Sequence, residues 1–462
     1  MIDVLQKAIE TTSDKKVAFA DIRTEERITT NMNVTNGSLR DLSQASRSGT
    51  VARALVGECW GQASTTDELS HEVLTSLLDS AIKSAKASAK HSRKMFDLSS
   101  VRFTEKTRWQ TVKENPADVP LTDKLSFAMS LDKALNVSDK IVRRNSAYID
   151  SKRVYRLVNT LGARLEWDEL RTLAFVNAVA KEGSKMQYDY NNVAALGGFE
   201  VIRNIDVEEF GSRCANGAIA MLSAKKPPSG KMNVIMDGDI AGGIAHEVCG
   251  HASEADEVVK KRSFLTGLVG TKIGTDQVTM IDDGTLDGKY GSYPFDNEGI
   301  PTSKTMIIKN GVFKGYLHTI ETAVQMGVKP TGNARAQDYN RRIFARMTNT
   351  YFDKGDWKEE EIIAETKDGV LALKVMSGME DVVGGGVQVS ALKGYIIKNG
   401  EKTQLVRSMS LAGKVLEILE TVDAVSDNLI FTAGTCGKGE EDYIPVTSGG
   451  PYMRAKLILG GS

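Results

Sequence analysis

Hydrophobic positions recur every three to four residues in four parts of the first half of the chain, a spacing that places them on one helical face. The sequence therefore predicts helices over residues 1–13, 69–82, 121–135 and 206–222. The second helix is expected to follow a capping box formed by Thr65 and Glu68, and to lie across a sheet.

Between these helices, alternating and β-branched stretches predict strands. They cover residues 17–23, 27–35 and 49–57, and Asn36-Gly37 is a typical hairpin turn after the second of them. From Ile141 to Tyr190 several alternating segments follow one another and predict an antiparallel meander. The first half is thus expected to be an antiparallel sheet with packed helices.

A polar run with two prolines, at residues 225–230, interrupts both periods. We place a domain boundary there, with an N-terminal domain over residues 1–226 and a C-terminal domain over residues 227–462.

The second half is rich in strand and turn signals. Lys231 to Met236 is a short apolar run typical of a buried strand, and Asp237 or Asp239 is placed to cap a helix after it. Two later apolar runs, residues 305–309 and 395–398, each end in Asn-Gly and predict hairpins.

Length and composition exclude several classes of protein. A chain of 462 residues can bury a substantial core in two or more domains. With 59 basic and 60 acidic residues, its net charge of -1 favours neither nucleic acid nor anionic lipid. No apolar run approaches the roughly 20 residues of a membrane helix, and the first residues lack a signal-peptide core. We expect a cytoplasmic protein without direct nucleic-acid or membrane contacts.

The chain has five histidines, and two of them, His246 and His251, flank a glutamate and a glycine. Neutral imidazoles hold zinc, and a carboxylate beside them takes a proton from water, so Glu247 is the candidate base. Five positions turn an undistorted helix roughly 140° past the first ligand, so the helix must bulge for both rings to reach one ion. We expect the distortion at Gly250, because glycine tolerates backbone angles that other residues avoid.

The other three histidines lack this setting. His71-Glu72 begins like a zinc motif but has no second histidine at four or five residues, so we interpret it as a solvated helix face. His91 is interpreted as a surface residue near a helix end. His318 follows the first of the two later hairpins and could approach the site, but no ligand spacing surrounds it, which favours a structural histidine.

A third ligand must come from a distant part of the chain. Cysteines occur at positions 59, 214, 249 and 436, without a paired framework, which fits a reducing compartment. Cys436 lies on a polar, glycine-rich loop, the setting of a thiolate ligand, whereas the other three are interpreted as packing residues or as unassigned.

Two carboxylates follow the second histidine. Glu254 and Asp256 lie where a carboxylate often orients a ligand imidazole, although an exposed acidic turn fits the sequence equally well. Glu254 is also the alternative third ligand if Cys436 is remote.

Four further residues are candidates for substrate contacts. Arg335 and Lys438 could neutralise an oxyanion or a substrate carboxylate, or make structural hydrogen bonds. Gly385 and Gly386 belong to a run of three glycines, which predicts a strand edge where an extended peptide could pair.

Several segments together resemble the TldD/PmbA family, the "modulator of DNA gyrase" metallopeptidases of bacteria and archaea, over almost the whole chain. They are residues 246–251 with Glu254 and Asp256, and residues 330–335, 346–350 and 436–439. TldD-type members carry H-E-x-x-x-H and a distal cysteine, whereas PmbA-type members lack the metal residues, so the chain resembles the catalytic type. By this resemblance His246, His251 and Cys436 bind one zinc ion per chain, and Glu247 is catalytic.

The resemblance also implies an architecture, a substrate class and an assembly. The expected fold class is α+β, with an N-terminal α/β domain of antiparallel sheet and packed helices. A C-terminal β-rich, barrel-like domain is expected to carry a short metal-binding helix. Unfolded or small peptides are the implied substrates, and a homodimer or a heterodimer with a PmbA-type partner is the implied assembly.

Two other functions stay open. In the first, the chain is a non-catalytic assembly subunit with a structural zinc ion; closed structural sites have four protein ligands, and only three strong candidates are visible. In the second, the chain is a zinc amidase that acts on a small molecule, because the metal chemistry would be identical.

Overall fold

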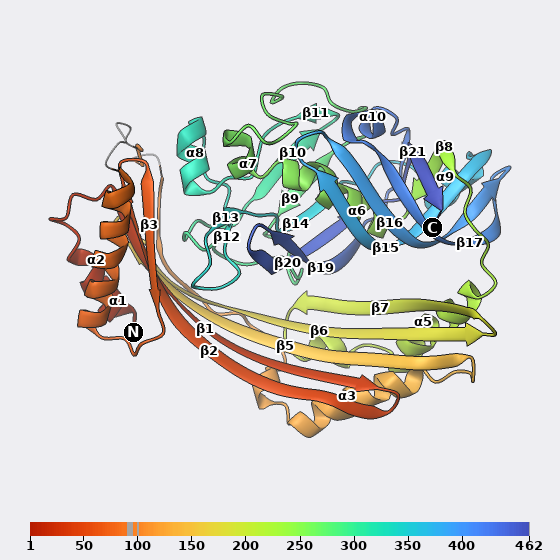
Figure 1. Cartoon of the computed structure of the whole chain (residues 1–462), viewed down its shortest axis with the longest axis horizontal. Helices are drawn as coiled ribbons and strands as arrows, with labels where there is room; N and C mark the ends of the chain where they lie inside the picture. Colours follow the sequence, from red (N-terminus) through yellow and green to blue (C-terminus); the bar gives the residue numbers. More distant parts are fainter. Residues whose placement is uncertain (90–95, 99–100, 462) are drawn as a thin grey trace.

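The computed structural model describes residues 1–89, 96–98 and 101–461, so His91 lies outside the described residues. The first half forms one long, curved, seven-stranded sheet, and the second half lies above its concave face (Figure 1). The strand order is β3-β2-β1-β5-β6-β4, and β7 also pairs with β6. The strands are β1 (Phe19–Thr35), β2 (Ser38–Val56), β3 (Cys59–Thr65), β4 (Glu105–Arg108), β5 (Ile141–Asn159), β6 (Arg164–Glu182) and β7 (Lys185–Leu196).

Asn36 and Gly37 both have positive φ angles, 48° and 75°, and connect β1 to β2 in the predicted hairpin. The predicted break between residues 23 and 27 is wrong, because β1 runs through it without interruption. Charged residues in this stretch pair with the neighbouring strand β5: Glu26 lies 2.5 Å from Arg156. Cross-strand ion pairs thus replace the apolar alternation on which the prediction depended.

Helices cover two parts of the sheet with separate cores. Residues of α1 and α2 pack on one end of the sheet, and residues of α3 and α5 pack on the other end. The helices of this half are α1 (Ile2–Glu10), α2 (His71–Ser88), α3 (Leu121–Ala134), α4 (Glu200–Arg203) and α5 (Val207–Met221).

The predicted capping box before α2 is wrong. Thr65 is the last residue of β3, where it pairs with Thr50. The helix begins at His71, and the side chain of Ser70, its N-cap, accepts the N–H of Val73.

The second half contains a closed ring of five strands and a separate six-stranded sheet. The ring runs β17-β16-β15-β8-β21, and a pairing between β17 and β21 closes it. Its strands are β8 (Gly230–Met236), β15 (Asp368–Asp381), β16 (Gly386–Lys398), β17 (Glu401–Lys414) and β21 (Met453–Gly461), with β18 (Ala424–Val425) on one edge. The expected barrel-like, β-rich second half is therefore present.

The other sheet has the order β11-β10-β9-β14-β20-β19. Its strands are β9 (Met280–Asp283), β10 (Lys304–Lys309), β11 (Val312–Phe313), β14 (Asn349–Phe352), β19 (Ile430–Lys438) and β20 (Glu441–Gly450). A small pair is formed by β12 (Ala334–Arg335) and β13 (Phe344–Ala345). The short helices of this half are α6 (Gly238–Ile244), α7 (Ala255–Val259), α8 (Ile320–Met326), α9 (Glu359–Ala364) and α10 (Val415–Leu419).

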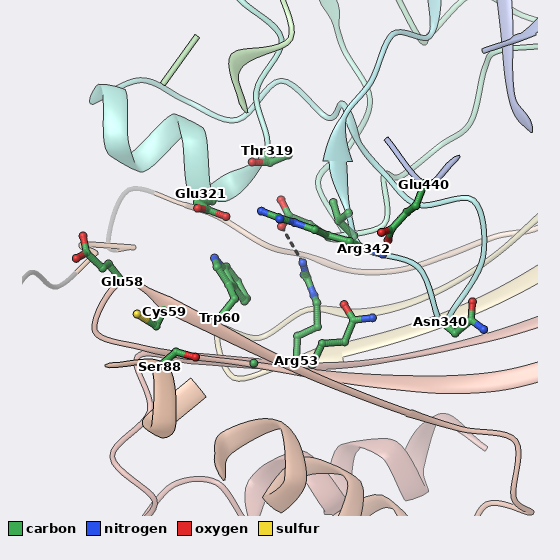
Figure 2. Close-up of a pocket in the computed structure, with 14 residues that line it drawn as sticks. Arg53, Glu58, Cys59, Trp60, Ser88, Thr319, Glu321, Asn340, Arg342 and Glu440 are labelled. Carbon is green, nitrogen blue, oxygen red and sulfur yellow. Dashed lines mark hydrogen bonds and ion pairs between the residues drawn. The ribbon is translucent and has the colours of Figure 1, made fainter. Parts of the chain in front are cut away.

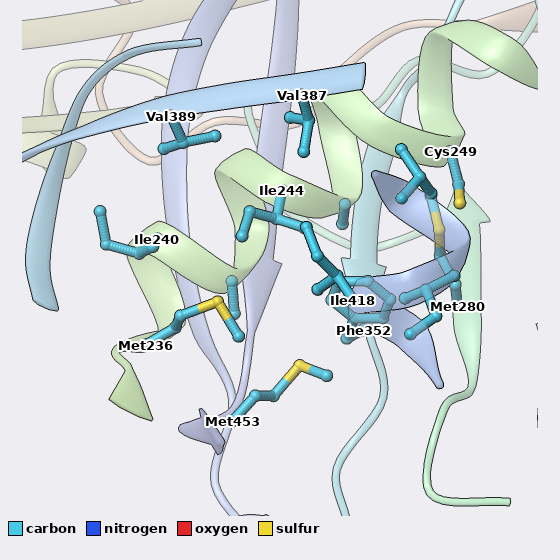
Figure 3. Close-up of a cluster of buried hydrophobic side chains, with 14 of the residues drawn as sticks. Met236, Ile240, Ile244, Cys249, Met280, Phe352, Val387, Val389, Ile418 and Met453 are labelled. Carbon is cyan, nitrogen blue, oxygen red and sulfur yellow. The ribbon is translucent and has the colours of Figure 1, made fainter. Parts of the chain in front are cut away.

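Helix α6 contributes Ile240 and Ile244 to the main core of the second half. Figure 3 shows these side chains between Val387 and Val389 of the barrel strand β16 on one side and Met236 of β8, Met453 of β21 and Phe352 of β14 on the other. Every residue of α6 is buried. The surrounding residues therefore hold α6 in place from all sides. This also fixes the start of the turn that follows it.

The two halves meet through buried charged contacts. Arg53 of β2 lies 3.0 Å from Glu298 in the second half, and its guanidinium stacks on Trp60 (Figure 2). A cavity of about 540 Å³ opens beside this pair, between the strand ends of the first half and residues near α8. Among the described residues, no helix is both long enough and apolar enough to cross a membrane.

Candidate metal centre

Strand β8 leads directly into the helix that carries the candidate ligands. The Asp237 carboxylate caps α6 by accepting the N–H of Ile240 at 2.8 Å. Two glycines of this helix allow β20 to approach closely, because a Cβ at Gly238 would lie 2.4 Å from a backbone oxygen and one at Gly242 2.5 Å from a backbone nitrogen. The site helix is thus fixed against β20, the partner strand of β19.

The turn after α6, Ala245–Gly250, is a π-helix. In this turn the N–H of His251 donates to the carbonyl of His246, five residues earlier. The π-type hydrogen bond places residue 251 above residue 246, so both imidazoles point to the same side, with ring centroids 5.0 Å apart. The distortion that the sequence predicts between the two histidines is present.

Gly250 has a different role from the expected one. It is not among the residues with positive φ, so the turn does not use glycine's backbone freedom there. Instead, a Cβ at this position would lie 2.1 Å from the sulfur of Met347. Glycine is therefore needed at position 250 because a larger side chain would collide with Met347.

Strand β19 brings Cys436 to the two histidines. Its Sγ lies 3.0 Å from Nε2 of His246 and 3.2 Å from Nε2 of His251. All three side chains are buried, and their ligand atoms lie within 4.8 Å of one another. The structure therefore brings together the three residues that the sequence predicted as ligands.

The local electrostatics favour a thiolate. Burial would raise the pKa of the Cys436 thiol, but the two imidazoles hold it well below its ordinary value. Burial would lower the pKa of His246, and the neighbouring thiolate raises it instead. The same holds for His251, whose pKa is raised by Glu254 and then by Cys436.

This donor set fits zinc. Two imidazoles and one thiolate are ligands that Zn²⁺ prefers, and tetrahedral bond lengths correspond to a nitrogen–sulfur spacing of about 3.5 Å. The observed spacings of 3.0 and 3.2 Å would widen by a few tenths of an ångström around an ion. The π-turn and β19 are thus arranged for a shared ion.

Charged residues surround the donors. Glu254 accepts from Nδ1 of His251 at 3.1 Å, so it contacts the nitrogen that faces away from Cys436. Lys438 lies 2.9 Å from Glu254 and 2.6 Å from Asp256. The structure therefore places Glu254 where it orients His251, and places Asp256 and Lys438 beside it in one network.

Arg346 extends this network to the sulfur, and the sequence gave it no role. It donates to Cys436 Sγ at 2.9 Å, and it pairs with Glu254 at 3.3 Å and with Glu441 at 2.7 Å. Arg346 begins residues 346–350, one of the segments that resemble the TldD/PmbA family, but that resemblance assigned it no contact with the sulfur.

Glu247 lies on the side of the π-turn that faces β15. It is half-buried, and Gly378 of β15 leaves room for it, because a Cβ there would lie 2.3 Å from the Glu247 side chain. Burial raises the pKa of Glu247 to about 7, and a hydrogen bond with Glu380 adds to this. Glu380 is an exposed residue of β15, in the hairpin that β15 forms with β16. The sequence did not single it out, because its contact with Glu247 depends on the position of this hairpin relative to the π-turn.

The remaining predicted substrate residues lie elsewhere. Gly385 has a φ of +68° in the turn between β15 and β16, and Gly386 is the first residue of β16. The expected strand edge is therefore wrong, because the run of glycines forms a hairpin turn in which Asp381 accepts the N–H of Gly384. Arg335 is buried, donates to the carbonyl of Met347 at 2.7 Å and does not contact the three donors.

The other described histidines are separate from the centre. His71 is exposed as the first residue of α2. His318 is buried, and its Nδ1 lies 3.2 Å from the hydroxyl of Thr322, but it belongs to neither group of potential metal ligands found among the described residues.

Three family models match the chain in succession. They describe domain 1 of the PmbA/TldA metallopeptidases at residues 20–89, their central domain at residues 114–222 and their C-terminal domain at residues 229–459. The candidate ligands and Glu247 all lie in the part that matches the C-terminal domain.

Curated relatives match over most of the chain. A metalloprotease of Methanocaldococcus jannaschii is 35% identical over 439 residues, which are 94% of this chain and 95% of that protein. A metalloprotease of Methanothermobacter thermautotrophicus is 34% identical over 97% of both chains. A protein of Saccharolobus solfataricus named zinc metalloprotease TldD homolog is 29% identical over 55% of this chain and 57% of its own length.

Solved structures share the fold. A Thermotoga maritima protein described as a modulator of a DNA gyrase superposes with a TM-score of 0.81 at 22% identity, over 99% of both chains. TldE of Thermococcus kodakarensis gives a TM-score of 0.77 at 19% identity, over 99% of this chain and all of that one.

Proposed function

The chain belongs to the PmbA/TldD metallopeptidase family, and on this premise we propose that it is a zinc-dependent peptidase for unfolded or small peptides. The observation that carries the proposal is the convergence of His246, His251 and Cys436 beside the carboxylate of Glu247. The names of the relatives support a metalloprotease, and one of them supports zinc.

His246 and His251 would hold the ion through Nε2, and Cys436 through its thiolate. When bound, zinc supplies Lewis acidity, which polarises a carbonyl group and makes water a better nucleophile at neutral pH. The Glu247 carboxylate takes the proton of the attacking water and passes it to the leaving amine. Glu254 fixes the ring of His251, and Arg346 fixes the sulfur of Cys436.

The number of donors supports a catalytic ion over a structural one. In the described part of the chain, three donors converge on one point, whereas closed structural sites have four protein ligands. Glu247 is also only half-buried. A closed structural zinc site needs no general base, so it would give this carboxylate no function.

Metal analysis of the purified protein tests the ligand set. We expect about one zinc ion per chain in the wild type, by plasma mass spectrometry, and loss of most of it in Cys436→Ala. Cys59→Ala is the matched control, because Cys59 is a free cysteine at the start of β3. A wild-type protein that takes up no zinc when zinc is supplied would overturn the proposal.

Substrate panels separate the peptidase from a small-molecule amidase. We expect hydrolysis of unstructured peptides and none of small non-peptide amides by the zinc-loaded protein. The reverse pattern would favour the amidase.

Three further expectations are part of this proposal. They are a domain boundary after residue 226, a cytoplasmic location, and assembly as a homodimer or with a PmbA-type partner. Limited proteolysis, cell fractionation and light scattering with and without such a partner would test them in turn.

A further inference from the structure

Arg335 is a buried guanidinium without a carboxylate partner. Its side chain is 6% exposed, its Nη1 donates to the Met347 carbonyl at 2.7 Å, and its Cζ lies 4.9 Å from the ring centroid of Tyr293. Among the described residues, no carboxylate lies within ion-pair distance of it, and its one side-chain hydrogen bond is the one to Met347. Burying an unpaired charge is costly, so this position calls for a negative partner.

A small cavity of about 20 Å³ lies against Arg335. Its walls come from both halves of the molecule: β5 and β6 on one side, and the loop between β9 and β10 with residues of β12 and β20 on the other. The polar side chains that line it include Arg153, Glu169, Arg171, Tyr293, Asn297 and Arg335.

The other two arginines of this cavity are already neutralised. Arg171 lies 2.5 Å from Glu169, and Arg153 lies 3.7 Å from Glu25. The charge of Arg335 is therefore the one left without a counterion at the cavity.

Asp296 also lines the cavity but does not supply the missing charge. Burial, and then the neighbouring Glu298, raise the pKa of Asp296 to about 8. Its two oxygens are already occupied by the N–H groups of Glu298, Ile300 and Ala334, at 2.9 to 3.0 Å. Asp296 is therefore held by backbone N–H groups and is not an ion-pair partner of Arg335.

We propose that this cavity is a binding site for one monoatomic anion, of the chloride class, held by Arg335. The charge requires an anion, and the volume restricts it, because about 10–15 Å³ holds a single water-sized particle and a carboxylate or phosphate group needs several times more. The anion would lie between the first-half sheet and the second half, and would stabilise their contact. The site is separate from the metal centre and does not depend on the proposed peptidase function.

Crystals grown in bromide test the site directly in the wild-type protein. We expect an anomalous difference peak in the cavity, within hydrogen-bond distance of Arg335. An empty cavity, or one filled by water without anomalous signal at saturating bromide, would overturn the proposal.

Thermal unfolding gives a test in solution. When chloride replaces gluconate at constant ionic strength, we expect the wild-type midpoint to rise by on the order of 1 °C for each tenfold increase in chloride above its Kd. Arg335→Met should remove this dependence, and Arg335→Lys, which keeps the charge, should retain part of it.

Arg342→Met is the matched control, because Arg342 is an exposed arginine of the same segment. It should respond to chloride as the wild type does. An equal chloride response in Arg335→Met and in the wild type would contradict the proposal. If Arg335→Met does not fold, Arg335→Lys and the bromide experiment on the wild type still decide it.

Discussion

The chain contains two His-Glu dipeptides, and the structure gives them opposite surroundings. His71-Glu72 opens α2, where both side chains are exposed and Glu72 lies in the first turn, a position that suits the helix dipole. His246-Glu247 lies in a π-turn inside the second half, with His246 buried against Cys436. Identical side chains therefore lie at a helix end in one place and in a candidate metal centre in the other.

Three features separate the two dipeptides. The second one has an i to i+5 hydrogen bond that aligns another histidine, a cysteine from a distant strand, and a carboxylate that orients the ring of His251. None of these features is a property of the dipeptide itself. Single substitutions in and around the two dipeptides therefore test what separates them.

The largest difference is expected at the two glutamates. Glu247→Gln should lower peptide hydrolysis by about 10²–10⁴-fold while the zinc content is unchanged, because a general base contributes that much. Glu72→Gln should keep the wild-type rate. Turnover by Glu247→Gln equal to that of the wild type would mean that the two dipeptides differ in metal binding alone.

A third histidine, His318, shows whether burial alone makes a site. Burial lowers the pKa of His318 from 6.5 to about 4, so the unfolded chain binds its proton more readily than the folded one. The neutral, buried His318 therefore contributes its full stability above pH 6.5, and the free energy of unfolding falls by about 3 kcal/mol as the pH falls from 6.5 through 4.

Urea unfolding of the zinc-loaded protein at several pH values measures this contribution. His318→Gln should unfold with a flatter pH profile between 6.5 and 4, and with unchanged zinc content. If the pH profile of His318→Gln equals that of the wild type, a group other than His318 is responsible for the pH dependence.

Glu254 tests the role of the orienting carboxylate that His71 lacks. Glu254→Gln should weaken zinc binding by about 10–100-fold, measured by competition with a chromophoric chelator. Glu257→Gln is the control, because Glu257 pairs with Arg262 at the surface. Equal zinc affinity in both variants would remove Glu254 from the site.

The smallest effect is expected at Gly250. Gly250→Ala should lower the free energy of unfolding by about 1 kcal/mol, because its Cβ meets the flexible end of Met347, which can partly move aside. Gly434→Ala meets nothing within 4 Å and should be neutral. A loss in Gly434→Ala as large as that in Gly250→Ala, by thermal unfolding, would contradict the packing argument.

Local backbone conformation could be predicted from the sequence. Asn36, Asn310 and Asn399, each followed by glycine, all have positive φ angles in the hairpins that the Asn-Gly pairs predict. The distorted turn between His246 and His251 was also predictable, because the spacing of five residues does not suit an α-helix.

Long-range pairing was not readable in the same way. The closure of the barrel depends on β17 meeting β21, some 50 residues apart, and no periodicity within either strand specifies it. Arg346, Glu380 and Glu441 are single charged residues whose partners arrive from other elements. Cys436 was predicted from its polar, glycine-rich surroundings and from the family resemblance, but the predicted loop is wrong, because Cys436 lies in strand β19.

The sequence separation of the three donors has a consequence for biosynthesis. Cys436 lies 190 residues after His246, on a strand near the end of the chain. Synthesis proceeds from the N-terminus, at roughly 5–20 residues per second, so a ribosome carries both histidines for about 10–40 seconds before the cysteine is made. A growing chain therefore lacks the complete candidate centre until almost all of the protein has been made.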